Sequence, residues 1–472
     1  MQPVYYISPE KATVFSIAPA LTLNTAVGIM IKNSAYADFR GANMDINRLR
    51  GYIIPNVLAT LGVSLYILAD TYFISASAGA NGLTALNLAL PLYSAIFAVS
   101  AMLGNGAATA FTLGKAIPGS DADTYFSHAV MADILFSIPF ILAGVFIPDK
   151  ILAFFGADEV IIATGKIYVR TFLTCTPFFM LNNTFTSFVR NDGAPKIAMV
   201  ATLTSCLFNI VFDYILMFPC GLSMFGAALA TGLSPAVSML VTLVHFLSKR
   251  NIIRFRVVLP SPRKLIRACR LGIGYFVSEI SGGVSGFVFN KILLNLVGNI
   301  AVAAYGIVAN VSVVGTAIFS GVAQGLQPMA SEAQGMGDEP GKKGIFRYSI
   351  RTGIILASTI IAVLWIFARE IVDVFNSENS AGLASLAVDN LRYYVIGFLP
   401  AAVNIVLCGY LGAVGRDRLC SIVSVTRGIF AIVLFALVLS NLFGIVGVWI
   451  AYPVTEVFTL TMAILILCKK GL

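Results

Sequence analysis

Charged side chains are scarce in this chain. Asp, Glu, Lys and Arg make up 11% of its 472 residues, whereas soluble domains carry about 25%. Hydrophobic residues make up 58% of the sequence. This composition has too few charges for a water-soluble surface, so we expect an integral membrane protein that lies mostly within the lipid bilayer.

Motifs of enzymatic chemistry are also missing. The sequence has no Walker A, GxSxG or HExxH pattern, which leaves ATP hydrolysis and nucleophilic catalysis without a recognisable site. Its seven cysteines have no CxxC spacing, and most lie in or beside apolar segments, so we expect free thiols and no metal site. The net charge of +9 comes from basic residues between apolar runs, without an aromatic-lined stripe. We therefore expect neither an enzyme nor a nucleic-acid partner, and no cofactor.

Long apolar runs are what the chain does have. A run of about 20 residues is long enough to cross the hydrocarbon core as a helix. The sequence predicts an all-α, polytopic membrane protein with twelve such helices, near residues 52–76, 84–111, 126–148, 162–189, 196–217, 224–248, 268–296, 300–330, 346–369, 386–412, 419–440 and 445–468.

The second half of the chain repeats the first at a spacing of about 220 residues. GANGLTALNLALPL from Gly79 aligns with GNIAVAAYGIVANV from Gly298, and FGAALATGLSPAVSMLVTLVHFL from Phe225 aligns with VGVWIAYPVTEVFTLTMAILIL from Val446. Six spans separate equivalent points, so the copies share one orientation in the membrane. We predict two pseudo-symmetric six-helix lobes.

The predicted organisation is an N-terminal lobe at 48–248, a basic linker at 249–267 and a C-terminal lobe at 268–472. Residues 1–47 form an extension that we assign to neither lobe, and we expect translation to begin at Met44. The segment 249–270 is rich in Lys and Arg and has no acid, which indicates a cytoplasmic loop. An even number of spans then places both termini in the cytoplasm, in a multi-pass protein of the cell inner membrane.

Two acids stand alone in long apolar stretches. Asp70 is the only charged residue from 51 to 114, and Asp213 is the only one from 197 to 248. A carboxylate in mid-span costs several kcal/mol unless it is paired or protonated, so such acids are candidates for functional sites. Asn209 precedes Asp213 by one helical turn and shares its helix face.

Two carboxylates in one pocket of low dielectric cannot both stay ionised without a cation. We predict that Asp70 and Asp213 bind a sodium ion or share protons, and that side-chain oxygens of Asn183, Asn209 and Thr231 complete an oxygen shell. An isolated intramembrane Asp could instead hydrogen-bond a kinked backbone. Asn183 and Thr231 could equally serve helix packing.

Glu279 is the best candidate for a functional acid in the C-terminal lobe, where it either binds substrate or contributes to ion coupling. Lys291 and Glu456 receive no assigned role. The predicted tenth span, VNIVLCGYLGAVG, contains no acid and only Asn404 as a polar amide.

Several segments together resemble the multidrug and toxin extrusion (MATE) family. They are YILADTYFIS from Tyr66, the GNGA stretch at 104–107, RNDGAPK from Arg190, NIVFD from Asn209 and ALAT from Ala228, and the resemblance runs from about residue 48 to the end. It implies a two-lobed antiporter that expels organic cations in exchange for protons or sodium ions. It also matches the five N-terminal polar residues with the family's cation site, and Glu279 with an acid of some family branches. The missing acid in span ten argues against a C-terminal sodium site.

Two other functions remain as alternatives. A flippase for a lipid-linked anion of the same superfamily should line its cavity with arginines, whereas the mid-span charges here are mostly acidic. We therefore expect a cavity with Asp70, Asp213 and Glu279 and no balancing arginine. A multispanning enzyme is the third alternative. As partners we expect small organic cations and the lipid bilayer, and we expect a monomer.

Overall fold

The computed structural model describes residues 46–115, 120–249, 251–259, 261–375 and 381–469. The expected start at Met44 and most of the N-terminal extension lie outside these residues. The described elements are α3 (Ile46–Lys115), η1 (Ala122–Thr124), α4 (Tyr125–Phe146), α5 (Pro148–Phe154), α6 (Glu159–Thr174), α7 (Thr176–Asn191), α8 (Pro195–Met217), α9 (Ser223–Phe246), α10 (Pro262–Leu296), α11 (Asn299–Met336), α12 (Glu339–Ile366), α13 (Ala368–Phe375), α14 (Ala381–Val395), α15 (Phe398–Ala413), α16 (Asp417–Val425), η2 (Thr426–Phe430) and α17 (Ala431–Lys469).

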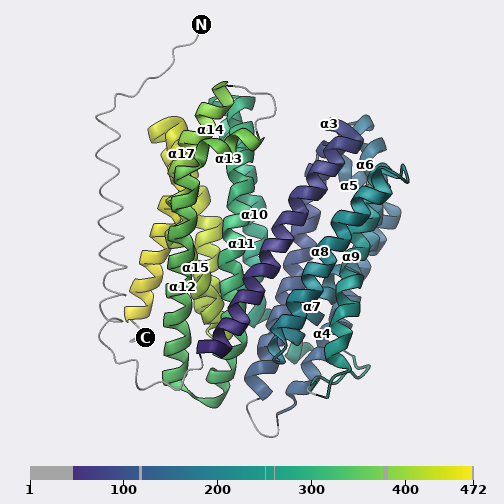
Figure 1. Cartoon of the computed structure of the whole chain (residues 1–472), viewed down its shortest axis with the longest axis vertical. Helices are drawn as coiled ribbons and strands as arrows, with labels where there is room; N and C mark the ends of the chain where they lie inside the picture. The colour runs from purple at the N-terminus through teal and green to yellow at the C-terminus, as the bar shows by residue number, and fades with distance from the viewer. Residues whose placement is uncertain (1–45, 116–119, 250, 260, 376–380, 470–472) are drawn as a thin grey trace.

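The helices form two groups (Figure 1). Helices α3 to α9 make the N-lobe and helices α10 to α17 make the C-lobe. The lobes come together where α3 begins, beside the lower end of α12. At the opposite end they lie apart, with α5 and α6 in one lobe and α13 and α14 in the other. We call these the convergent end and the open end.

Nine described helices are long and apolar enough to cross a membrane, and a bent pair, Gly382–Val395 with Phe398–Ala413, is a tenth. The count is lower than twelve for two structural reasons. The predicted spans 419–440 and 445–468 join at Gly444 without a loop, within the stretch Asp417–Lys469. The predicted span 162–189 is interrupted at Cys175, which divides it into α6 and α7, each of 16 residues.

Glycines with positive φ mark equivalent breaks in the two halves. Gly79 has φ 64° and ψ −158°, and Gly298 has φ 98° and ψ −162°. Gly444 breaks α17 in a similar way, with φ 60° and ψ −135°. Glycine adopts this region without the steric cost of a Cβ atom. Gly79 and Gly298 are aligned by the sequence repeat and have similar backbone conformations. Each of them marks the point where one span ends and the next begins.

Glycines also let the lobes touch at the convergent end. A Cβ atom on Gly272 of α10 would lie 2.0 Å from the Met102 carbonyl oxygen of α3, and one on Gly321 of α11 would lie 2.6 Å from the Val57 Cα atom. No side chain fits between such closely packed backbones. We call these contacts the glycine seam. It joins α3 to the first two helices of the C-lobe.

The outer faces of the lobes carry exposed apolar side chains. Phe154, Leu240 and Leu465 expose 84%, 65% and 65% of their surfaces. Patches of this kind are unfavourable in water but match the hydrocarbon of a bilayer. Their position agrees with a multi-pass membrane protein.

Candidate functional site

The two isolated acids of the N-lobe lie together. Asp70 extends from α3 and Asp213 from α8, and their carboxyl groups are within hydrogen-bonding reach of each other. Asp70 is 7% exposed and Asp213 is 0% exposed. Neither acid forms an ion pair with a basic side chain among the described residues. This is a buried pair of like-charged groups whose neutralisation requires a proton or an external cation.

Further polar atoms surround the pair. Asn209, one turn before Asp213 on α8, donates a hydrogen bond from Nδ2 to the Thr231 hydroxyl of α9 at 3.2 Å. This bond turns the Asn209 carbonyl oxygen away from Thr231. Asp70 Oδ1, Asn209 Oδ1 and both carboxyl oxygens of Asp213 are buried and accept no hydrogen bond from the described residues. Buried acceptors of this kind are rare unless something else satisfies them.

The set of unpartnered atoms fits a hard cation. All four are oxygens, carried by two carboxyl groups and one amide, and oxygen ligands are what hard cations prefer. Protons would also satisfy the carboxyl groups, as an O–H donor on one acid can bond the other. Asp70, Asp213 and Asn209 are the residues that would hold the ion, and Thr231 orients Asn209.

The C-lobe has no equivalent set. In the register fixed by Gly79 and Gly298, the residue matched to Asp70 is Phe289, which is 1% exposed. In the register of the second repeated segment, the residue matched to Thr231 is Tyr452. Both aromatic residues belong to the apolar core of the C-lobe. Aromatic side chains therefore occupy the C-lobe positions that match Asp70 and Thr231 of the buried acid site.

A cavity of about 640 Å³ lies between the lobes. Asn183 of α7 lines it from the N-lobe and Glu279 of α10 lines it from the C-lobe. Asp70 and Asp213 are not part of the lining; Tyr66, one turn before Asp70, lines the cavity and lies close enough to both acids to interact electrostatically with them. The predicted residues therefore separate into a buried acid site and a cavity wall, with Asn183 on the cavity side.

The expectation of an acidic cavity without arginines is wrong. Four charged side chains line the cavity among the described residues: Arg190, Glu279, Arg427 and Glu456. The wall is therefore balanced between positive and negative charge. Asp70 and Asp213 contribute their charge from behind the wall rather than on it.

Arg190 closes the cavity toward the convergent end and was not predicted as a site residue. Its guanidinium donates to Asn56 Oδ1 at 3.0 Å, to Asn105 Oδ1 at 2.9 Å and to Gln324 Oε1 at 2.7 Å. Gln324 belongs to α11 of the C-lobe, so this network crosses between the lobes. These hydrogen bonds link the N-lobe to the C-lobe at the convergent end. The signal in the sequence was the RNDGAPK segment, which begins with this arginine.

The Asn209–Thr231 bond gives a prediction of moderate size. In Thr231→Val the hydroxyl acceptor is lost and the Asn209 amide can rotate, so we expect the affinity of the buried acid site for sodium to fall about 3- to 10-fold. Thr242→Val on the same helix is the matched control, because the Thr242 hydroxyl bonds only its own helix, at Met239 O. Sodium binding to the purified protein, measured by isothermal titration calorimetry, checks both variants. Equal shifts in the two would contradict a role for Thr231 in the site.

Comparisons with known proteins agree on one family. The family model described as MatE matches residues 55–215 and 276–437, which lie in the two halves of the sequence repeat. Multidrug export protein MepA of Staphylococcus saprophyticus is 26% identical over 421 residues, covering 88% of this chain and 92% of that protein. MepA of Staphylococcus aureus is 27% identical over 420 residues, with the same coverage of 88% and 92%.

Solved structures share the fold. An outward-facing multidrug resistance MATE transporter of the MOP superfamily superposes with a TM-score of 0.83 at 22% identity, covering 89% of this chain and 94% of the other. A MOP superfamily transporter from Pyrococcus furiosus, described as having a binding pocket of reverse polarity, superposes with a TM-score of 0.81 at 22% identity. The match again covers 89% of this chain and 94% of the other.

Proposed function

The chain belongs to the MATE family, and from that membership we propose that it exports organic cations in exchange for protons or sodium ions. It is a multi-pass membrane transporter and not an enzyme. The observation that carries the proposal is the buried acid site, with its four unpartnered oxygens, directly behind the wall of a cavity that both lobes line. An ion at Asp70 and Asp213 and a solute in the cavity would then bind on opposite sides of Tyr66.

Alternating access follows from the two ends of the molecule. The cavity is closed at the convergent end by the glycine seam and by Arg190, while the lobes are apart at the open end (Figure 1). Export requires a second arrangement in which the convergent end opens and the open end closes. Rocking of two similar lobes around a central site is how repeat-built transporters achieve this.

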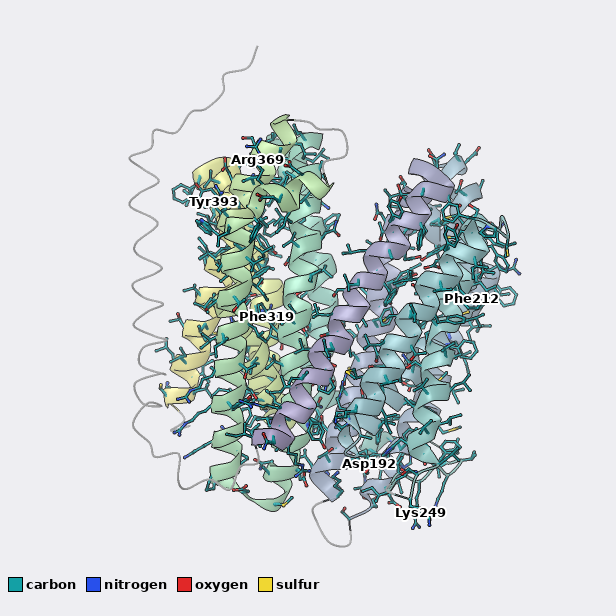
Figure 2. All side chains as sticks on the ribbon, in the orientation of Figure 1. Asp192, Phe212, Lys249, Phe319, Arg369 and Tyr393 are labelled. Carbon is teal, nitrogen blue, oxygen red and sulfur yellow. The ribbon has the colours of Figure 1, made fainter. Side chains whose placement is uncertain are left out.

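We assign the convergent end to the cytoplasm. Lys249, at the start of the basic segment, lies at this end together with Asp192 (Figure 2), whereas Arg369 and Tyr393 lie at the open end. Short loops rich in Lys and Arg stay on the cytoplasmic side. The structure is then outward-facing, both termini are cytoplasmic, and one copy of the chain in the inner membrane contains a complete cavity.

A flippase for a lipid-linked anion is the second candidate, because two arginines line the cavity. Two glutamates on the same wall, Glu279 and Glu456, balance their charge, and Glu456 pairs with Arg427 at 2.7 Å. The wall therefore offers no surplus of positive charge for a polyanionic headgroup. The buried acid site has no evident use in a flippase.

The proposal is tested by efflux of a fluorescent cation, rhodamine 6G, from proteoliposomes. A sodium gradient and a proton gradient are imposed separately, with protein-free liposomes as the control. We expect at least one of the two ion gradients to drive the dye against its own concentration gradient. Dye movement that follows neither gradient would contradict ion-coupled export.

A further inference from the structure

Arg427 lies on an unusual turn of the C-lobe. It is the only charged residue from 419 to 440, and it is part of the π-helical segment η2 between α16 and α17. Such single π-helical turns occur frequently at functional sites. The next residue, Gly428, packs directly on α10, since a Cβ atom there would clash with the Ser281 hydroxyl. The turn therefore holds Arg427 against the helix that carries Glu279.

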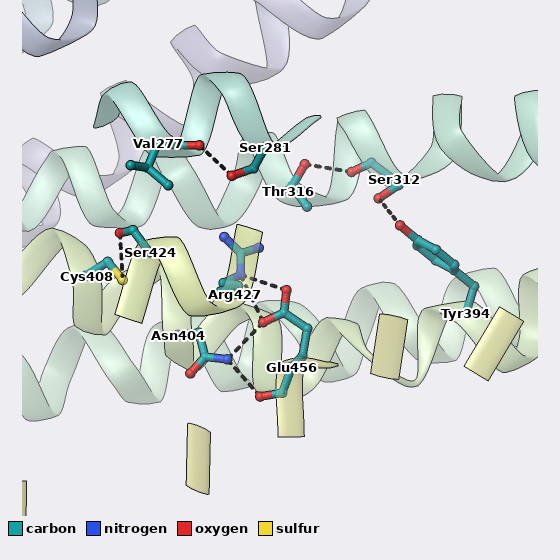
Figure 3. A network of polar contacts seen from close by, with 10 residues as sticks. All are labelled: Val277, Ser281, Ser312, Thr316, Tyr394, Asn404, Cys408, Ser424, Arg427 and Glu456. Carbon is teal, nitrogen blue, oxygen red and sulfur yellow. Dashed lines mark hydrogen bonds and ion pairs between the residues drawn. The ribbon is translucent and has the colours of Figure 1, made fainter. Parts of the chain in front are cut away.

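One edge of the Arg427 guanidinium is fixed by Glu456 of α17 (Figure 3). Its Nε donates to Glu456 Oε1 at 2.7 Å and to Oε2 at 2.9 Å. Asn404 of α15 holds the same glutamate by donating from Nδ2 to its Oε2 at 2.8 Å and to its backbone carbonyl at 2.9 Å. Glu456 is 1% exposed. The pair is thus locked in one orientation by three helical elements.

The other edge of the guanidinium faces the cavity. Its two terminal nitrogens point away from Glu456 toward α10 and α11, on the side of Ser281 and Thr316 (Figure 3). They form no hydrogen bond of normal geometry with the described residues, and Arg427 lines the cavity. A guanidinium presents its N–H groups as a planar fork that fits the two oxygens of a carboxylate.

Glu279 supplies the opposite charge on the same wall. It lines the cavity from α10, two residues before Ser281, and its side chain is exposed there. No described basic residue forms an ion pair with it. The Glu279 carboxylate and the Arg427 guanidinium, whose nearest further polar neighbour is the Tyr452 hydroxyl, therefore both line the cavity, together with the aromatic rings of Phe289, Tyr305 and Tyr394.

We propose that this wall is a binding site for dipolar solutes, in which Arg427 binds a carboxylate of the solute and Glu279 attracts its cationic group. The inference rests on the proposed export of organic cations and narrows the cargo to molecules that carry both charges. Arg427 is then the residue that distinguishes a dipolar solute from a simple cation. Glu456 and Asn404 position it.

Two dyes of the same skeleton test the proposal. Rhodamine 6G carries its carboxyl group as an ethyl ester and is a cation, whereas rhodamine 19 has the free carboxylate and is dipolar. Binding to the purified full-length protein is measured by fluorescence polarisation, which avoids differences in membrane permeation. The informative variant is the double substitution Arg427→Gln/Glu456→Gln, because it removes both charges together and leaves no buried glutamate without its partner.

The double variant should lose affinity for rhodamine 19 relative to rhodamine 6G by about tenfold, the value expected for one charge-assisted bidentate interaction. Arg427→Lys should give a smaller change in the same ratio, because an ammonium lacks the fork. Glu279→Gln should lower the affinity for both dyes to a similar extent, because both carry the same cationic group. Thermal unfolding of each variant in detergent verifies that it is folded.

An unchanged ratio of the two affinities in the folded double variant would overturn the assignment of Arg427, even if the wild-type protein binds and exports rhodamine 6G. Failure of the wild-type protein to bind rhodamine 6G at all would instead contradict the proposed export of cations, on which the inference rests. A loss of affinity for rhodamine 19 with little change in the affinity for rhodamine 6G supports the proposal.

Discussion

Gradient-driven efflux is expected to fall to the rate of passive leak in Asp70→Asn and in Asp213→Asn. The amide keeps the size of the carboxyl group and one acceptor oxygen, but it can neither take up a proton nor carry a negative charge for sodium. Because the two acids lie within reach of each other and have unpartnered oxygens, the loss of one removes the coupling of the whole pair. Efflux of rhodamine 6G from energised proteoliposomes measures the effect.

Asp133→Asn is the matched control for these substitutions. Asp133 of α4 is also buried in the N-lobe, at 0% exposure, and its Oδ1 is likewise unpartnered in the described part of the chain. It differs in that no second acid among the described residues acts on it and its Oδ2 accepts a hydrogen bond from the Thr184 hydroxyl at 2.6 Å, which an amide oxygen can also accept. We expect this variant to transport nearly normally. Dye binding in detergent should persist in all three variants. Full transport by either pair variant would remove Asp70 and Asp213 from the coupling mechanism.

Gly272→Val is expected to abolish transport through sterics rather than charge. Its first added carbon would lie 2.0 Å from the Met102 carbonyl oxygen, so the glycine seam cannot close around it. Overpacking of this kind costs about 1–3 kcal/mol even in a compliant core, and here the obstacle is backbone. The arrangement in which the convergent end is closed becomes unfavourable, and the cycle stops. Efflux and thermal unfolding are measured together.

The control is Gly286→Val on the same helix, where an added Cβ atom has no neighbour within 4 Å. This variant experiences the same change of helix propensity and should transport normally. Gly272→Ala should be intermediate in effect, since it adds one carbon. Normal transport by Gly272→Val would show that α3 and α10 do not need this close approach during the cycle.

The acid site was predictable because its signal is local. Asp70 and Asp213 each stand alone among apolar residues, and one helical turn relates Asn209 to Asp213, so burial and a shared face follow from sequence alone. The same rule would have found Arg427, the single charge in 419–440. Basic residues near span ends also mark orientation in the membrane, which masks this signal, although an arginine in mid-span needs a partner as much as an aspartate does.

The cavity wall was beyond the reach of a single sequence. Nearly every position of an apolar helix is compatible with facing lipid, another helix or a water-filled space, so the sequence pattern does not select the cavity face. The pairing of Arg427 with Glu456 joins residues of η2 and α17 that are related only through the fold. The break at Cys175, by contrast, has a local signal, because Pro177 follows it and lies in the first turn of α7.

The aromatic residues that take matched ion-site positions in the C-lobe bear on the history of the molecule. Phe289 stands where the repeat places Asp70, and Tyr452 stands where it places Thr231. If both halves descend from one duplicated gene, they have since divided the work between them. Two N-terminal halves assembled as a dimer would contain two ion sites and lack the Arg427 wall, and two C-terminal halves would contain the wall and no ion site.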